Sequence, residues 1–183
     1  VCSSFQYFPG IPIYESKDLI NWELIGHVLT RDSQLPLTHA GNDGGLYAPT
    51  IRFHKGRFYV VVTNVNGCGN FLVWTDDIHG DWSEPVPIDR DGIDPSLCFE
   101  ENRVFFMSNH GDSDGGASIL QCEIDPVSGK ILTEVRAIWR GCGGRYLEGP
   151  HLYRINGFYY LMAAEGGTEY GHMEVIARSN SPY

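Results

Sequence analysis

An internal repeat constrains the fold of this chain more than any other feature of its sequence. Three prolines align the stretches 49–64, 95–110 and 150–165 without a gap: Pro49, Pro95 and Pro150. A large aromatic side chain stands ten positions after each proline: Tyr59, Phe105 and Tyr160. The prolines are 46 and 55 residues apart. This period is close to the roughly 40–50 residues and four strands of one β-propeller blade.

Each copy of the repeat contains the same succession of strands and turns. A short apolar strand follows the proline, at 50–53, 96–99 and 151–153, and then a polar turn, at 54–56, 100–102 and 156–157. A stronger aromatic and β-branched strand comes next, at 58–63, 104–107 and 158–163, and a third strand at 71–75, 119–124 and 173–178. A faint fourth strand lies near 84–88 and 135–139. No window sustains a helical period, so we expect an all-β chain, a propeller in preference to a sandwich or meander.

The two ends of the chain predict an incomplete propeller. Val1–Ser4 and Ile13–Ser16 resemble the second and third strands of a blade with no first strand before them, and the last residues close a third strand. We therefore expect about three and a half blades in one partial domain, 1–183. Its parts are 1–46 (remainder of a first blade and a connection), 47–92 (second blade), 93–147 (third blade) and 148–183 (start of a fourth). Such a piece leaves sheet edges that only closure removes.

The composition of the chain argues against two classes of binding partner. The net charge is −10 and the pI about 5.0, which argues against nucleic acid and against an anionic membrane surface. No apolar stretch approaches the roughly 20 residues of a membrane-spanning helix. Five scattered cysteines without a C-x-x-C pair predict mostly reduced thiols in the core.

Two carboxylates stand at matching places in the repeat. Asp94 immediately precedes the second proline, and Glu148 precedes the third by two positions. Acids at the same end of successive inner strands converge on the propeller axis, and glycoside hydrolysis needs two such carboxyl groups close together. An acid before a proline is more commonly a turn residue, so the in-phase pair carries the argument rather than either residue alone.

Several motifs occur in a fixed order: Ser3-Ser4-Phe5-Gln6-Tyr7-Phe8-Pro9-Gly10, Ser16-Lys17-Asp18-Leu19-Ile20-Asn21-Trp22, Gly44-Gly45-Leu46-Tyr47-Ala48-Pro49-Thr50, Gly92-Ile93-Asp94-Pro95-Ser96-Leu97, Glu148-Gly149-Pro150-His151-Leu152, Ala164-Glu165-Gly166-Gly167-Thr168 and Ile176-Ala177-Arg178-Ser179. Together they resemble glycoside hydrolase family 43, in its β-xylosidase and α-L-arabinofuranosidase branch, over essentially the whole chain. The resemblance implies a five-bladed propeller that hydrolyses with inversion, of which this chain is an N- and C-terminally incomplete part.

The resemblance also implies roles for the two carboxyl groups. Glu148, in the Glu-Gly-Pro-His motif, takes the place of the general acid, and Asp94, in the Gly-Ile-Asp-Pro-Ser motif, that of the residue that modulates its pKa. The general base of the family is an aspartate in a Pro-Asp-Pro-Ser motif upstream of the Ser-Ser-Phe segment, and this chain contains no such motif. Sequence upstream of Val1 or a companion chain that completes the propeller would supply the base, or the chain would be inactive.

Four further residues are candidates for substrate contact. The family's subsite aromatics align with Phe5 and Tyr47, and a substrate-contacting threonine aligns with Thr168, whereas His151 is singled out because it lies three residues from Glu148. The seven histidines lack zinc-ligand spacing. The segment 112–116 lacks the closing glutamate of a calcium loop and is interpreted as a solvated turn. We expect no metal or cofactor within this chain, and the resemblance places any structural calcium ion in blades that lie outside it.

The sequence thus predicts an inverting glycosidase that releases xylose or arabinofuranose from plant-polysaccharide fragments, with a xylo- or arabino-oligosaccharide as partner. Two alternatives stay open: an endo-arabinanase-like hydrolase, and a non-catalytic carbohydrate-binding propeller fragment or partner subunit. Both pentoses are neutral, so the sequence does not choose between them, and it assigns no cellular compartment.

Overall fold

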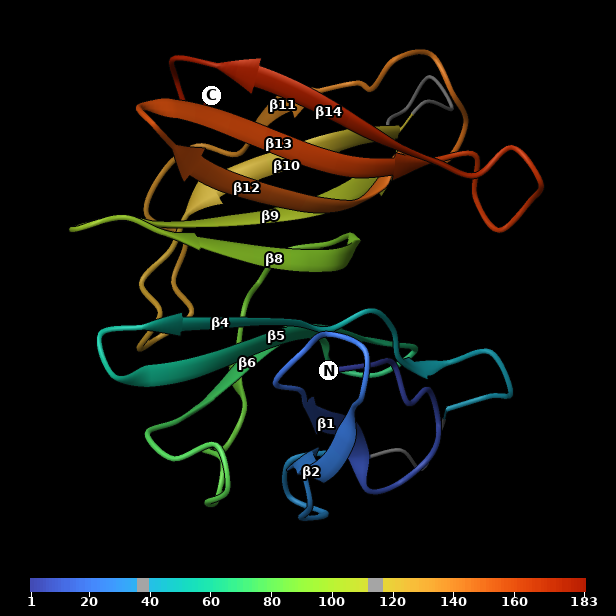
Figure 1. Ribbon diagram of the computed structural model, residues 1–183, viewed down its shortest axis with the longest axis vertical. Coiled ribbons are helices and arrows are strands. Elements are labelled where there is room, and N and C mark those ends of the chain that lie inside the picture. Colours follow the sequence, from blue (N-terminus) through green and yellow to red (C-terminus); the bar gives the residue numbers. More distant parts are fainter. Residues whose placement is uncertain (36–39, 112–116) are drawn as a thin grey trace.

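The computed structural model describes residues 1–35, 40–111 and 117–183, and these residues form strands but no helix (Figure 1). The prediction of an all-β chain is confirmed. The predicted turn at 112–116 and the histidine at position 39 lie outside the described residues. No helix in this part of the chain is long and apolar enough to cross a bilayer.

The strands form four antiparallel sheets that follow one another along the chain. Sheet 1 contains β1 (Gly10–Glu15) and β2 (Glu23–Leu29). Sheet 2 contains β3 (Gly45–Leu46), β4 (Thr50–His54), β5 (Arg57–Val65), β6 (Gly69–Thr75) and β7 (Val86–Pro87), with β3 and β4 both paired to β5. Sheet 3 contains β8 (Ile93–Phe99), β9 (Val104–Gly111), β10 (Ala117–Glu123) and β11 (Arg136–Trp139) in that order. Sheet 4 contains β12 (Glu148–Ile155), β13 (Phe158–Glu165) and β14 (Met173–Ser179).

All eleven strands predicted from the repeat occur, with ends shifted by a few residues, and the errors lie at the N-terminal end of the chain. Val1–Ser4 is not a strand, because the backbone there has only the isolated bridge from Phe5 to Leu46. The strand predicted at Ile13–Ser16 is β1, which pairs with β2 instead. Strand β2 was not predicted, since its residues do not alternate between buried and exposed and so give no period-two signal.

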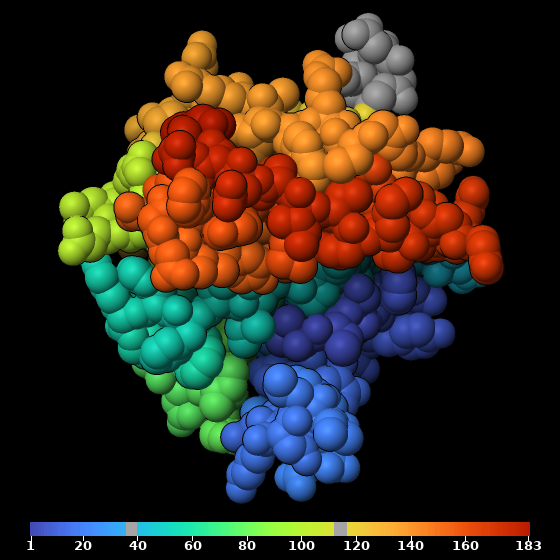
Figure 2. All heavy atoms as spheres, turned by 45° about the horizontal axis from the view of Figure 1, so that its top comes forward, coloured from blue at the N-terminus to red at the C-terminus, as the bar shows by residue number. Residues whose placement is uncertain are grey.

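Alternate residues of the central strands pack into different cores, because successive side chains of a strand point to opposite faces. In β5, Val60 and Val62 pack against sheet 1, whereas Val61 packs against sheet 3. In β9, Phe106 packs toward sheet 2, and Phe105 toward sheet 4. Sheets 2 and 3 are therefore buried on both faces, and the sheets stack in order of sequence, from sheet 1 at the bottom of Figure 1 to sheet 4 at its top. In Figure 2 the blue and teal N-terminal part of the chain likewise lies below the orange and red C-terminal part. The number of blades, the boundaries expected for them and the closure of a ring stay predictions.

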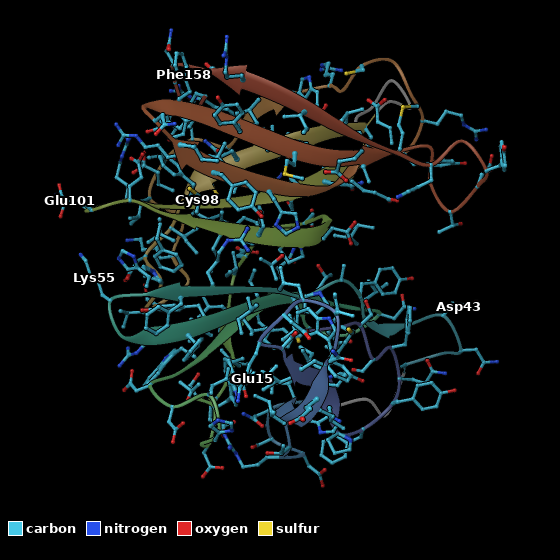
Figure 3. All side chains as sticks on the ribbon, in the orientation of Figure 1. Glu15, Asp43, Lys55, Cys98, Glu101 and Phe158 are labelled. Carbon is cyan, nitrogen blue, oxygen red and sulfur yellow. The ribbon has the colours of Figure 1, made fainter. Side chains whose placement is uncertain are left out.

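The sheets present two different edges. The strands β4, β8 and β12 run in the same direction and begin on the same side of the molecule, at the right in Figure 1. We call the segments at this side, 43–50, 91–94, 141–148 and 165–172, together with Phe5, which bridges to Leu46, the starting edge. The hairpins 54–57, 99–104 and 155–158 form the opposite turn edge, where Lys55 and Glu101 lie close together in Figure 3 and the Lys55 Nζ donates to the Glu101 carbonyl over 3.1 Å.

The cysteines fit the prediction only in part. All five thiols are free, and Cys98 and Cys122 are buried between sheets. Cys2, Cys68 and Cys142 are exposed, so the expectation that most of the thiols lie in the core is wrong. These three stand in turns and loops rather than in the middle of a strand.

Candidate active site

The structure brings Asp94 and Glu148 to the same place on the starting edge. Asp94 is the second residue of β8, and Glu148 is the first residue of β12 in the next sheet. The backbone N–H of Gly149, next to Glu148, donates to Asp94 Oδ2 over 3.2 Å. The two carboxyl groups therefore belong to one site, although 53 residues separate them in the sequence.

The segment that carries Asp94 has a constrained backbone. Asp94 itself has a φ of 53°, and Gly92 has a φ of 103°. A Cβ on Gly92 would lie 2.0 Å from the Asn109 carbonyl oxygen, so only glycine fits there. Asn70, a buried residue of sheet 2, donates from Nδ2 to the Gly92 carbonyl over 3.0 Å and to the Arg90 carbonyl over 2.6 Å. Sheet 2 thus fixes the start of β8.

Burial controls the protonation of Asp94. Loss of solvent and the neighbouring charge of Glu148 both raise the pKa of its carboxyl group, the Gly149 N–H lowers it, and together they bring the pKa to about 6. The carboxyl group is thus ionised at neutral pH and takes up a proton in mildly acidic solution.

Glu148 opens onto a cleft of about 260 Å³ lined also by Tyr146, Gly167, Thr168 and Glu169. The side chain is half-buried. Partial burial raises the pKa of its carboxyl group, and the charge of the nearby His172 lowers it. A carboxyl group with a raised pKa beside an open cleft has the properties that a general acid requires.

Thr168 lines the same cleft as Glu148, as expected for a residue that contacts substrate. Phe5 and Tyr47 form a second part of the starting edge, with ring centroids 5.9 Å apart in an edge-to-face arrangement. Phe5 is 44% exposed, and the Tyr47 hydroxyl donates to the Asp43 carbonyl over 2.7 Å. Figure 3 shows Asp43 on the starting edge. An aromatic pair of this kind, with Phe5 exposed and Tyr47 half-buried, presents faces on which sugar rings can stack.

His151 has a different environment from the other candidates. Its Nδ1 lies 2.9 Å from Arg52 Nη2, and its ring stacks near Tyr153. Because a guanidinium only donates, Nδ1 is the acceptor, and a neutral ring carries its proton on Nε2. Burial and the charge of Arg52 lower the pKa of His151 to about 4. The residue is not among those that line the cleft beside Glu148, and its contact with substrate stays a prediction.

Sequence reasoning missed several residues around the acid. Tyr146, with a φ of 55° and 48% exposed, forms a wall of the cleft. Asn109 Nδ2 donates to the Leu147 carbonyl over 2.8 Å and so supports the residue just before Glu148. The charge of His172 acts on Glu148, whereas the sequence raises this histidine only as a candidate zinc ligand. None of the three matches the repeat, so no spacing singled them out. Across the described ranges, no cluster of His, Cys, Asp or Glu has the arrangement of a metal site.

Two carboxyl groups held together at one edge of stacked sheets define a site of the kind that glycoside hydrolases use. Comparison with known proteins places the chain within that class. The family model for glycosyl hydrolases family 43 matches residues 1–183. The chain belongs to glycosyl hydrolase family 43.

Relatives in this family have names of two kinds. The chain is 45% identical over 187 residues to the non-reducing end α-L-arabinofuranosidase BoGH43B of Bacteroides ovatus, with 100% of this chain and 35% of that protein covered. It is 37% identical over 189 residues to a β-xylosidase of Bacillus subtilis, with 97% and 36% covered. A solved structure of a GH43_12 protein from a capybara gut metagenome superposes with a TM-score of 0.91 at 39% identity, over 98% of this chain and 37% of that one. The chain thus spans about a third of the length of these relatives.

Proposed function

We propose that the protein containing this chain is an inverting glycoside hydrolase that releases xylose or arabinofuranose from plant-polysaccharide fragments. Glu148 is the general acid that protonates the leaving oxygen, and Asp94 modulates its pKa. The single observation that carries this proposal is the juxtaposition of the two carboxyl groups, with the Gly149 N–H bonded to Asp94 Oδ2 at 3.2 Å. The names of the relatives, arabinofuranosidase and β-xylosidase, support a pentose as the sugar released.

The placement of the two groups, rather than their pKa shifts in the free site, is the basis of this division of roles, because the Glu148 charge raises the pKa of Asp94 whereas burial raises that of Glu148. The carboxyl group of Asp94 is more deeply buried than that of Glu148, and the Gly149 N–H favours the ionised form of Asp94. Glu148 faces the open cleft, where an arriving sugar removes water from the carboxyl group. Loss of water and the adjacent Asp94 charge both favour protonation of Glu148. Substrate binding therefore places the proton on the residue that must donate it.

The leaving group binds on the side of Glu148 that the cleft exposes. A proton from Glu148 reaches the glycosidic oxygen as the bond from that oxygen to the anomeric carbon breaks, and water adds to the opposite face of the sugar. A base is needed to activate that water. We place it in sequence upstream of Val1, in keeping with the Pro-Asp-Pro-Ser motif of the family. Phe5 and Tyr47 would hold the pentose, and Thr168 would contact it beside the acid.

The proposal is tested on the complete protein with aryl β-xylosides, aryl α-L-arabinofuranosides, xylo-oligosaccharides and linear arabinan. Proton NMR of the first turnovers identifies the anomer of the released sugar. We expect hydrolysis of at least one aryl pentoside, with the inverted anomer formed first. Release of internal arabinan fragments would favour the endo-arabinanase alternative instead. Binding of these sugars without hydrolysis would show a carbohydrate-binding protein and would contradict the proposal.

A further inference from the structure

Glu165 is a buried carboxylate on the starting edge that the proposed mechanism does not use. It is the last residue of β13 and only 1% exposed. Its Oε1 accepts the backbone N–H of Cys142 over 2.6 Å, and its Oε2 accepts that of Gly144 over 3.0 Å. Each oxygen thus binds one N–H of the loop 141–146, which has no regular strand partner of its own. Backbone N–H groups outside regular strands also need acceptors, and here the buried side chain of Glu165 supplies them.

The loop is shaped around this carboxylate. A Cβ on Gly141 would lie 1.8 Å from Glu165 Oε1, and a Cβ on Gly144 would lie 2.3 Å from Oε2. A larger residue at either position would displace the carboxylate, which accounts for Gly141 and Gly144 in this segment. Successive backbone N–H groups directed at one anion form the kind of concave binding site that proteins use for bound anions. In this chain the anion is a side chain of the protein itself.

Contacts continue from this loop to the general acid. The N–H of Gly166 donates to the Arg145 carbonyl over 2.7 Å. Three residues after Arg145, Glu148 pairs with Ala164, the neighbour of Glu165 in β13. Between these links, Tyr146 packs so closely on Gly167 that a Cβ on that glycine would lie 2.7 Å from the ring. The end of β13 and the residues just after it therefore contact the chain segment that leads to Glu148.

We propose that Glu165 is a positioning residue for the general acid, an inference that rests on the proposed function. Its carboxylate fastens the loop 141–146 to the end of β13, and the loop in turn fixes the backbone from which Glu148 and Tyr146 extend into the cleft. Proton donation depends on sub-ångström placement of the acid relative to the leaving oxygen. Loss of the anchor shifts Glu148 without removing it.

The test uses Glu165→Gln in the complete protein, with Glu100→Gln as a matched control. Glutamine keeps the length of the side chain but turns one acceptor into a donor that faces a backbone N–H. Glu100 is also a largely buried carboxylate, but it lies on the turn edge. The substrates are a methyl pentoside, whose leaving group needs a proton, and a 2,4-dinitrophenyl pentoside, whose leaving group departs without one.

For Glu165→Gln we expect kcat/KM for the methyl pentoside to fall on the order of 10²-fold, the scale of a displaced catalytic group. For the dinitrophenyl pentoside, kcat/KM should fall much less. Glu100→Gln should leave the ratio of the two kcat/KM values unchanged. An equal loss on both substrates would show a purely structural role and overturn the inference. Unchanged activity of Glu165→Gln in an active enzyme would also overturn it, while the proposed function would stand.

Amide hydrogen exchange provides a readout that does not depend on activity. In Glu165→Gln, the peptide that contains Cys142 and Gly144 should exchange faster than in the wild type, and peptides from the turn edge should not change. If the amides of the loop 141–146 were as protected from exchange in Glu165→Gln as in the wild type, Glu165 would not be the residue that holds the loop. If the wild-type protein hydrolyses none of the pentosides, the proposed function fails and the assignment of Glu165 to catalysis fails with it.

Discussion

The two edges of the sheets use carboxylates in opposite ways. On the turn edge, Glu100 accepts hydrogen bonds from the Tyr159 hydroxyl and, at 2.5 Å, from Arg103 Nη2. Burial alone would raise the pKa of Glu100, but these hydrogen bonds and the arginine charges hold it below its usual range. On the starting edge, burial and a second carboxylate raise the pKa of Asp94 to about 6. The ionised form of Glu100 therefore stabilises the fold at the turn edge, whereas the ionised form of Asp94 destabilises it at the starting edge.

The largest effect should come from Glu148→Gln in the complete protein. Glutamine cannot donate a proton to the leaving oxygen, so the rate on pentosides with poor leaving groups should fall about 10²- to 10⁴-fold, the contribution of a general acid. Steady-state kinetics measure this change. Near wild-type activity of this variant on an ordinary glycoside would remove Glu148 from the mechanism. The same substitution at Glu100 should leave the rate unchanged.

Asp94→Asn should stabilise the protein at neutral pH. Because the folded-state pKa of about 6 lies above the ordinary value of 3.8, the ionised group destabilises the fold above pH 6, and this cost disappears as the pH falls below 4. A shift of about two units corresponds to roughly 3 kcal/mol as an upper figure. Chemical denaturation at pH 8 and pH 4 measures the difference between variant and wild type. A gain of equal size at both pH values would contradict the raised pKa.

Glu100→Gln should change stability in the opposite direction. Removal of the charge weakens the hydrogen bond from Tyr159, which joins sheets 3 and 4, and the one from Arg103 within the same hairpin, at a cost of about 1.5–3 kcal/mol. Because the folded-state pKa of Glu100 is lowered, its contribution is present above the ordinary value of 4.5 and is lost as the pH falls through the folded-state value. Thermal unfolding at pH 7 and at pH 3 should therefore show a larger destabilisation at pH 7. Equal destabilisation at both pH values would show that the charge of Glu100 does not matter.

The smallest effect should follow from Tyr47→Ala on the starting edge. Its ring packs edge-to-face with Phe5, and together the two rings offer a face to the bound sugar. The contact of one such ring with the sugar is taken as about 1 kcal/mol, the scale of an aromatic contact. We expect KM for the preferred pentoside to rise about fivefold, since 1.4 kcal/mol is a factor of ten, with kcat nearly unchanged. Tyr47→Phe is the matched control, because it keeps the ring and loses only the hydroxyl bond to the Asp43 carbonyl. A large fall in kcat for Tyr47→Ala would show that the ring does more than bind sugar.

The fold was predictable where the repeat governs burial. In sheets 2 and 3 the alternation of Val60 with Val61 and of Phe105 with Phe106 follows from strands buried on both faces. At the N-terminal end the signal was absent, since β2 buries Val28 and Leu29 in succession rather than alternately. The placement of Val1–Ser4 depends on the Phe5 bridge to Leu46, a contact across 41 residues that no local pattern reveals.

The site was predictable as far as the repeat and the family motifs reach. Position in the repeat singled out Asp94 and Glu148, and the structure brings them together. Tyr146, Asn109 and Glu165 act through the folded shape of the loop before β12, so their neighbours in space are remote in sequence. The contact between Arg52 and His151 joins residues 99 positions apart, and no motif or repeat spacing in the sequence predicted it.

If Asp94 and Glu148 act as one electrostatic unit, the pH–rate profile of Asp94→Asn must differ from that of the wild type. We expect a slower enzyme in which the limb of the profile that reports the general acid moves to lower pH, because Asp94 no longer supplies the negative charge that keeps the proton on Glu148. A profile with the wild-type shape and position would show that the two carboxyl groups act independently.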